Sequence, residues 1–402
     1  MIEGAQRTGA ASAREEPAWG AVVSMTLGVF GLVTAEFLPA SLLTPMAADL
    51  GVTEGLAGQA VTATAVVALV TSLLVSTATR RIDRRIVLLS FSILLTVSNL
   101  LVAFAPGLPA LLLARVLLGV ALGGFWTMSA ATVMRLVPEA LVPRALSLLF
   151  SGVSAATVAA APMGSYFGDI IGWRGVFVIA AGLGLLALAV QVATLPRMAP
   201  SGTTRLRTLV EVLARPQVGF GMLAVLLVFT GHFAFFTYIR PFLETVTGVG
   251  ITGVSGILLG FGIANFLGTF LGGFLLERSM RLTMMLMPLT MGVLGLGLVA
   301  VGGGAPVANT AMVALWGVAF GAVPVAWSTW LTRTVPDEAE SAGGLLVAAV
   351  QLAIATGAAA GGAIFDVSGA LGVFTAAGFV LLVAAVMITV GIRPRRTAAA
   401  AA

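Results

Sequence analysis

Long apolar runs, separated by short polar turns, follow one another along almost the whole chain. A segment of about 20 apolar residues crosses a bilayer as a helix, and a helix satisfies its own backbone polar groups in lipid. The pattern therefore predicts an all-α polytopic membrane protein with twelve transmembrane helices. The predicted spans are 19–46, 57–79, 86–105, 108–133, 145–168, 173–195, 217–242, 251–276, 282–303, 307–332, 341–364 and 369–392.

The longest polar interruption between spans divides the twelve helices into six and six. The two groups of six show signs of an internal repeat. Phe37-Leu38-Pro39 near the end of the first span corresponds to Ile239-Arg240-Pro241 near the end of the seventh. Duplicated halves are typical of secondary transporters. The predicted organisation is an N-terminal tail 1–18, a six-helix bundle 19–195, a cytoplasmic linker 196–216 with a short surface helix, a second six-helix bundle 217–392 and a C-terminal tail 393–402.

The arginines predict the orientation. All 21 basic residues are arginine, and Arg115 lies well inside a span, away from both of its ends. If the spans alternate in direction, 18 arginines fall on one side and only Arg174 and Arg240 on the other. Because positive loops stay in the cytoplasm, we expect both termini to be cytoplasmic and the protein to lie in a bacterial inner membrane.

Composition narrows the function classes. Charged residues make up 9% of the chain, against about 25% in soluble domains. There is no cysteine and a single histidine, so we expect no metal site and no disulfide. No phosphate-binding GxxxxGK[ST] loop is present. We therefore expect no cofactor, no nucleic-acid partner and no enzymatic activity, because the spans carry no nucleophile–base set.

Glu36 lies in the middle of the first apolar run and is the leading candidate for handling a proton. An ionisable group at this depth usually faces a partner or a water-filled cavity. Arg115 in the fourth span is placed at a comparable depth by the helix rise, so we expect the two to pair directly or through water. The alternatives are that Glu36 only hydrogen-bonds at the cavity mouth and that Arg115 only binds helix carbonyls.

Several other side chains could bind a substrate. His232 could titrate, could hydrogen-bond a ribose or a purine, or could be a neutral packing residue. Aromatic faces stack on planar bases, and amides offer a donor and an acceptor together; for each, packing between helices is the competing interpretation. The predicted substrate contacts are Trp126, Phe233, Tyr238, Asn265, Trp327 and Gln351.

A further group of residues suggests gating. Gly119 and Gly123 allow close helix approach, and Pro162 with Gly164 should kink or loosen the fifth span. The loop that contains Asp83, Arg84 and Arg85 is expected mainly to set topology, with gate contacts as a second reading.

Several stretches resemble the major facilitator superfamily, in particular its drug:proton antiporters. They are AEFLPASLLTPMAADLG in the first span, Arg115-x-x-x-Gly119-x-x-x-Gly123 in the fourth and Ala161-Pro162-Met163-Gly164 in the fifth. HFAFFTYIRPF and VPVAWSTWLTR resemble bacterial purine ribonucleoside efflux pumps. The loop between spans two and three departs from the superfamily pattern, with Arg80 where an Asp is usual.

This resemblance implies a central cavity lined by spans one, four, seven and ten, and a transporter that works as a monomer. It implies export of purine ribonucleosides such as inosine and guanosine in exchange for protons. A sugar or multidrug exporter with the same coupling is the main alternative. A non-transporting membrane sensor is a remote one, because the predicted tails are short.

Overall fold

The computed structural model describes residues 16–138, 141–200, 206–215 and 217–391. Most of the predicted N-terminal tail, the whole predicted C-terminal tail, and residues 201–205 and 216 of the predicted linker lie outside this range. Within it the regular elements are helices, with no strand. The helices are α1 (Trp19–Ser41), α2 (Leu43–Leu50), α3 (Glu54–Ala78), α4 (Arg84–Ala103), α5 (Leu108–Met134), α6 (Val142–Thr194), α7 (Leu206–Leu213), α8 (Val218–Thr237), α9 (Ile239–Thr245), α10 (Ile251–Arg278), α11 (Met280–Val301), α12 (Pro306–Thr334) and α13 (Ala339–Gly391), with short 3-10 turns at Gly302–Gly304 and Pro336–Glu338.

Two of these helices are each long enough to cross a membrane twice. In the described chain, ten helices have the length and composition of membrane spans, and the spans within α6 and α13 run for 51 and 50 residues. Each contains one glycine with a positive φ, Gly172 at 75° and Gly369 at 64°. This conformation is open to glycine and costly for other residues, so the helix reverses direction there. The predicted twelve-helix all-α fold is confirmed.

The first and seventh predicted spans are each interrupted near one end. The apolar run 19–46 divides at Leu42 into α1 and α2, and the run 217–242 divides at Tyr238 into α8 and α9. Proline offers no N–H to the carbonyl four residues before it. Pro45 therefore leaves the Ser41 carbonyl without its helical donor just at the break between α1 and α2.

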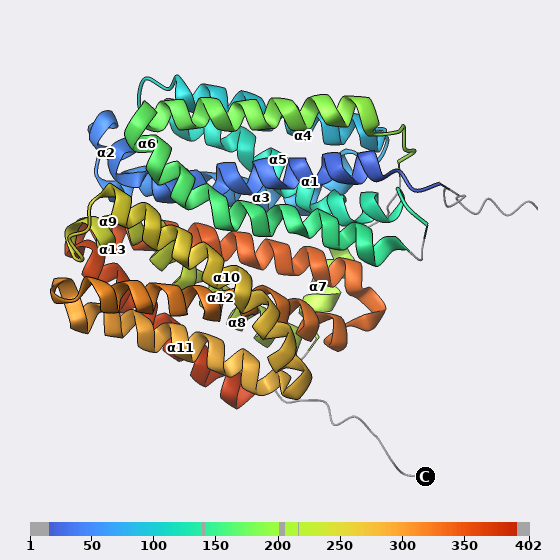
Figure 1. The fold of residues 1–402 in the computed structure, drawn as a ribbon. Helices are drawn as coiled ribbons and strands as arrows, with labels where there is room; N and C mark the ends of the chain where they lie inside the picture. The colour runs from blue at the N-terminus through green and yellow to red at the C-terminus, as the bar shows by residue number, and fades with distance from the viewer. Residues whose placement is uncertain (1–15, 139–140, 201–205, 216, 392–402) are drawn as a thin grey trace, which may run out of the picture.

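The helices form two groups with the same internal pairings (Figure 1). In the first half, α1 to α6, helix α1 packs on α6, α3 on α5, and α4 on both α5 and α6. In the second half, α8 to α13, the same pattern recurs with α8 on α13, α10 on α12, and α11 on both α12 and α13. The repeat seen in the sequence is thus a repeat of packing.

Two seams join the halves, α3 against α13 and α6 against α10. Glycines bring the backbones close along both: a Cβ on Gly362 would lie 2.8 Å from the Gly55 carbonyl oxygen, and one on Gly262 would lie 2.8 Å from the Val158 Cα. Small residues permit such close approach between membrane helices.

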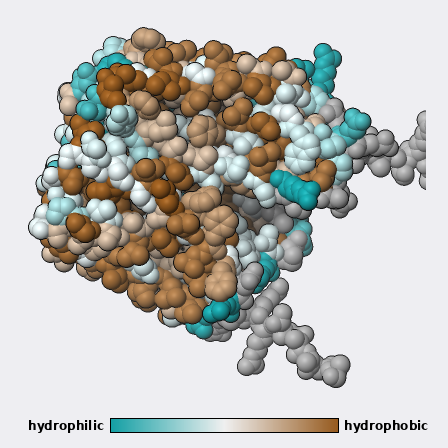
Figure 2. All heavy atoms as spheres, in the orientation of Figure 1, coloured by the Kyte–Doolittle hydropathy of each residue, from teal (hydrophilic) through white to brown (hydrophobic). Residues whose placement is uncertain are grey.

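Polar residues gather toward the two ends of the helices, and a broad hydrophobic surface lies between them (Figure 2). One end, here called the arginine-poor end, carries α2, α9, Arg174 and Arg240; the opposite, arginine-rich end carries α7. At the arginine-rich end, Arg215 binds Asp337 through both carboxylate oxygens, at 2.8 and 2.7 Å. This guanidinium lowers the pKa of the Asp337 carboxyl to about 2.

Candidate functional site

Glu36 lies on α1 with 9% of its surface exposed, where the two halves meet. It lines a cavity of about 10 Å³, which is room for about one water molecule. The lining combines first-half residues with second-half residues: Glu36, Phe37, Ala40 and Val61 from the first, and Phe233, Phe236, Thr237 and Ile354 from the second. The halves therefore close directly around this carboxyl group.

Arg115 is fully buried on α5, and its guanidinium hydrogen-bonds two backbone carbonyls. Nη1 donates to the Ala35 oxygen at 2.8 Å, and Nε donates to the Ala60 oxygen at 3.2 Å. The Ala35 carbonyl needs this donor because Pro39, four residues later, has no N–H. Arg115 thus fixes the α1 backbone one residue before Glu36.

The predicted pairing of Glu36 with Arg115 is electrostatic rather than a direct ion pair. The guanidinium lies close enough to act on the Glu36 charge, but its two bonded nitrogens are committed to carbonyls. The third nitrogen, Nη2, is buried without a hydrogen-bond partner in the described part of the chain. One charged donor therefore remains available near the carboxyl group.

Gln351 approaches Glu36 from the opposite half. It lies on α13 with 4% of its surface exposed, and its side chain reaches the Glu36 carboxyl group. Its Oε1 has no hydrogen-bond partner among the described residues, so the amide nitrogen is the group that faces the acid. Glu36 and Gln351 together form a polar contact between the halves, next to a cavity lined mostly by apolar side chains.

His232 is buried in the second half, 2% exposed. Trp316 Nε1 donates to its Nδ1 at 3.2 Å, and its ring stacks on Phe320 and Phe236. An indole N–H can only donate, so this geometry requires a lone pair on Nδ1 and favours the tautomer with the proton on Nε2. The structure buries the His232 ring within an aromatic cluster.

The remaining predicted substrate contacts are spread over several environments. Phe233 lines the Glu36 cavity. Tyr238 is fully buried, and its hydroxyl donates to the Ala358 oxygen at 3.0 Å. Trp327 is buried edge-to-face against Trp330, and Trp126 is half-buried and stacks on Phe150. Asn265 is half-buried on α10. Of these, the structure brings only Phe233 to the lining around Glu36.

The predicted gating glycines lie at close helix contacts. A Cβ on Gly119 would lie 2.6 Å from the Thr64 oxygen, and one on Gly164 would lie 2.4 Å from the Ser41 Oγ. Helix α6 continues through Pro162, and its non-helical residue is Gly172.

The loop residues predicted to gate contact residues of the first half and Met198 of the predicted linker. Asp83 caps α4 by accepting from the Arg85 N–H at 2.8 Å, and it also accepts from the Met198 N–H. Arg84 Nη1 donates to Thr79 Oγ1 at 2.9 Å, and Arg85 Nη2 donates to the Val192 oxygen.

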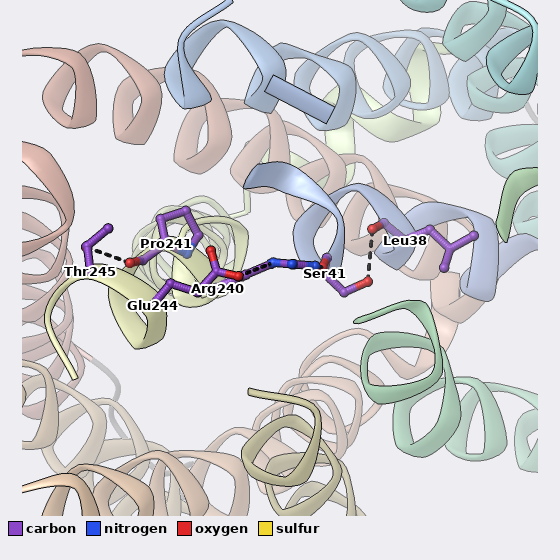
Figure 3. A network of polar contacts seen from close by, with 6 residues as sticks. All are labelled: Leu38, Ser41, Arg240, Pro241, Glu244 and Thr245. Carbon is purple, nitrogen blue, oxygen red and sulfur yellow. Dashed lines mark hydrogen bonds and ion pairs between the residues drawn. The ribbon is translucent and has the colours of Figure 1, made fainter. Parts of the chain in front are cut away.

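Sequence reasoning missed one contact between the halves. The sequence placed Arg240 near the end of the seventh span and used it only for the repeat and the orientation, but it is 4% exposed and donates from Nη1 to the Ser41 oxygen at the end of α1 (Figure 3). Its Nε donates to Glu244 at 2.8 Å. Pro45, four residues after Ser41, was the available signal, because it identifies a carbonyl in need of a donor.

A larger groove of about 540 Å³ opens between α6 and α10. Its lining is mostly apolar, with Tyr166, Thr252 and Ser255 as the polar members, and it shares no residue with the Glu36 cavity. The buried carboxyl group of Glu36 lies in the small cavity and not in this groove.

A buried polar site enclosed by two repeats of membrane helices is the architecture of a membrane transporter. The model of the Major Facilitator Superfamily matches residues 25–357. The chain belongs to the major facilitator superfamily.

The chain is similar to named proteins over nearly its whole length. It is 45% identical over 387 residues to the purine ribonucleoside efflux pump NepI of Escherichia coli strain K12, covering 96% of this chain and 98% of that protein. It is 46% identical over 383 residues to NepI of Shigella dysenteriae serotype 1, covering 95% and 97%.

Two solved structures share the fold. The D-xylose-proton symporter superposes with a TM-score of 0.74 at 16% identity, covering 94% of this chain and 97% of that one. A bacterial homologue of the human lysosomal transporter Spinster, in an inward-facing and unoccupied conformation, gives the same four values. At this identity the likeness concerns the fold alone.

Proposed function

We propose that this transporter exports purine ribonucleosides, such as inosine and guanosine, in exchange for protons. The substrate class rests on the 45% identity to an efflux pump of that name over 96% of the chain. The coupling rests on one observation of the structure, the buried carboxyl group of Glu36 enclosed by both halves.

Glu36 can link proton movement to the position of the two halves. Burial favours the neutral acid, and a nearby guanidinium favours the carboxylate. When the halves separate on one side, water enters and Gln351 leaves the acid, so the balance between the two charge states changes. Proton release to one compartment and proton uptake from the other then follow from alternating exposure of the same group.

The cavity lining suits a purine. Phe37, Phe233 and Phe236 surround Glu36, and aromatic faces stack on bases with about 1–3 kcal/mol per base in nucleic-acid complexes. Gln351 Oε1 is a free acceptor for a ribose hydroxyl or a base N–H. As the halves open, these groups would form the walls of a larger site.

The two six-helix bundles suggest how the transporter moves and how it is oriented. We propose that residues 19–195 and 217–392 rock as two units about the linker 196–216, and that both termini face the cytoplasm of a bacterial inner membrane. Both sides of the site come from one chain, Glu36 from the first half and Gln351 from the second, so a monomer is sufficient.

The test is uptake of labelled inosine into everted membrane vesicles driven by an acidic interior. We expect uptake by the wild type and uptake at the background of protein-free vesicles for Glu36→Gln, because the amide carries no exchangeable charge. Asp169→Asn is the matched control, since it removes an exposed acid on α6 and should transport normally.

Two other results of this uptake experiment would contradict parts of the proposal. Uptake by both wild type and Glu36→Gln would place the coupling group elsewhere. Absence of uptake by the wild type, with the protein present in the membrane, would remove the nucleoside assignment, and sugars and drugs would then be screened in the same vesicles.

A further inference from the structure

Arg240 occupies a buried position between the halves at the arginine-poor end. It lies in the first turn of α9, directly after the break at Tyr238 and before Pro241. In Figure 3 its side chain extends from α9 to the end of α1, where Nη1 donates to the Ser41 oxygen. Glu244, one helical turn later, accepts from Nε and orients the guanidinium.

The Ser41 carbonyl is a specific acceptor. Pro45 cannot donate to it, and Ser41 is 1% exposed, so water does not reach it in this state. A buried carbonyl without a partner is costly. The charged donor from the other half therefore satisfies a group that α1 cannot satisfy by itself.

The hydrogen bond of Arg115 differs from that of Arg240 in which halves it joins. It satisfies the carbonyl freed by Pro39 in the same helix, but Arg115 and Ala35 both belong to the first half. Arg240 and Ser41 lie 199 residues apart, in opposite halves. The first bond can persist through a rocking motion, whereas the second exists only while the halves touch at this end.

We propose that Arg240 is the lock of the arginine-poor end: its hydrogen bond to the Ser41 carbonyl holds the two halves together and breaks each time that end opens. This proposal rests on the alternating access proposed above. Apolar contacts lie beside the lock, with Phe37 edge-to-face on Phe236 at 5.3 Å between ring centres. When the halves separate, water can satisfy both the carbonyl and the guanidinium, so the lock is reversible.

The absence of cysteine makes the chain suitable for distance measurements between paired spin labels. Leu56→Cys on α3 and Gly250→Cys before α10 place exposed labels on the two halves at the arginine-poor end. A Cβ on Gly250 meets no atom within 4 Å. Ile82→Cys and Leu282→Cys, 41% and 51% exposed, report on the opposite end. Pulsed electron resonance in nanodiscs gives the distance distribution for each pair.

In the Arg240→Gln variant we expect the Leu56–Gly250 distribution to shift toward longer distances, with the open-to-closed ratio raised at least about tenfold, as expected for loss of a charge-assisted hydrogen bond. The Ile82–Leu282 pair should move closer in the same variant. Arg240→Lys should give an intermediate shift, because an ammonium can reach Ser41 but lacks the fork that also binds Glu244. If Arg240→Gln does not fold, the distances in the Arg240→Lys variant test the proposal.

Arg174→Gln is the matched control. Arg174 is the other arginine of this end, and its partners, Asp49 and the Ala105 carbonyl, lie in its own half. We expect no shift in this variant. Unchanged distances in both Arg240 variants, or an equal shift in Arg174→Gln, would overturn the lock.

These distances are measured without substrate, so they separate the two proposals. If the wild type does not transport inosine but the Arg240 variants shift as expected, the nucleoside assignment fails and the lock stands. If inosine transport is confirmed and the distances do not move, the lock fails alone.

Discussion

Two arginines in this protein donate to carbonyls of α1 that prolines leave without a helical donor. Pro39 and Pro45 each deprive a buried carbonyl of its donor, and Arg115 and Arg240 supply the missing hydrogen bonds. Hydrogen bonds from charged donors contribute about 1.5–3 kcal/mol, and an unpaired arginine in a membrane is costly. Each of these hydrogen bonds therefore removes two costs at once, that of a buried carbonyl without a donor and that of a buried guanidinium without an acceptor.

His232 allows a direct test of a protonation state. We expect its ring to be neutral at pH 7 with the proton on Nε2, because the Trp316 N–H occupies Nδ1. Nitrogen-15 NMR of protein labelled on histidine reports this without ambiguity, since the chain contains one histidine. The protein would be purified without a histidine tag.

Replacing the donor tests the cause. Trp316→Phe should release Nδ1 and give a mixture of tautomers, whereas Trp327→Phe, which removes a buried tryptophan that packs on Trp330, should leave the spectrum unchanged. A charged imidazolium at pH 7, or a proton on Nδ1, would contradict the assignment.

Helix contacts in this fold depend on glycines at a few positions where backbones nearly touch. On α5, a Cβ at Gly123 would lie 2.3 Å from the Ala68 carbonyl oxygen of α3. That oxygen belongs to a rigid helix and cannot rotate away as a flexible side chain could. The close approach of α3 and α5 is therefore possible only with glycine there.

We expect Gly123→Ala to destabilise the protein by about 1–3 kcal/mol, the usual cost of overpacking. The readout is a lower midpoint of thermal unfolding in detergent. Gly182→Ala in α6 is the control: no atom lies within 4 Å of its Cβ, and alanine has the better helix propensity, so its midpoint should stay or rise. An unchanged midpoint for Gly123→Ala would show that α3 and α5 can separate at little cost.

The arginines give a prediction for the orientation of the molecule in the membrane. The sequence places 18 arginines on one side of the predicted spans and two on the other, so the positive-inside rule predicts that Gly250 faces the outside and Leu282 the cytoplasm. A membrane-impermeant maleimide should label Gly250→Cys in intact cells and should label Leu282→Cys only after permeabilisation. The cysteine-free wild type provides the background, and the reverse labelling pattern would contradict this orientation.

The pattern of apolar runs was sufficient to predict the twelve spans and the repeat. The length of an apolar run and the composition of a turn are local properties of the sequence, and the thickness and apolarity of the bilayer determine which runs form spanning helices. The pattern also identified Glu36, Arg115 and Gln351, because a polar side chain in an apolar run stands out. It did not show the breaks at Leu42 and Tyr238. The prolines were visible, but where a helix breaks depends on which partners receive the freed carbonyls.

Those partners were decided only in three dimensions. The bonds from Arg115 to Ala35 and from Arg240 to Ser41 join residues 80 and 199 positions apart, and they depend on how each helix is rotated and how far it is shifted against its neighbour. The same holds for Tyr238 and Trp327: the sequence left substrate contact and helix packing open for both, and in this structure both side chains are buried between helices. Close packing at the glycine contacts fixes rotation and shift, so local residue chemistry shows which groups need partners, and the packed helices determine which partners they find.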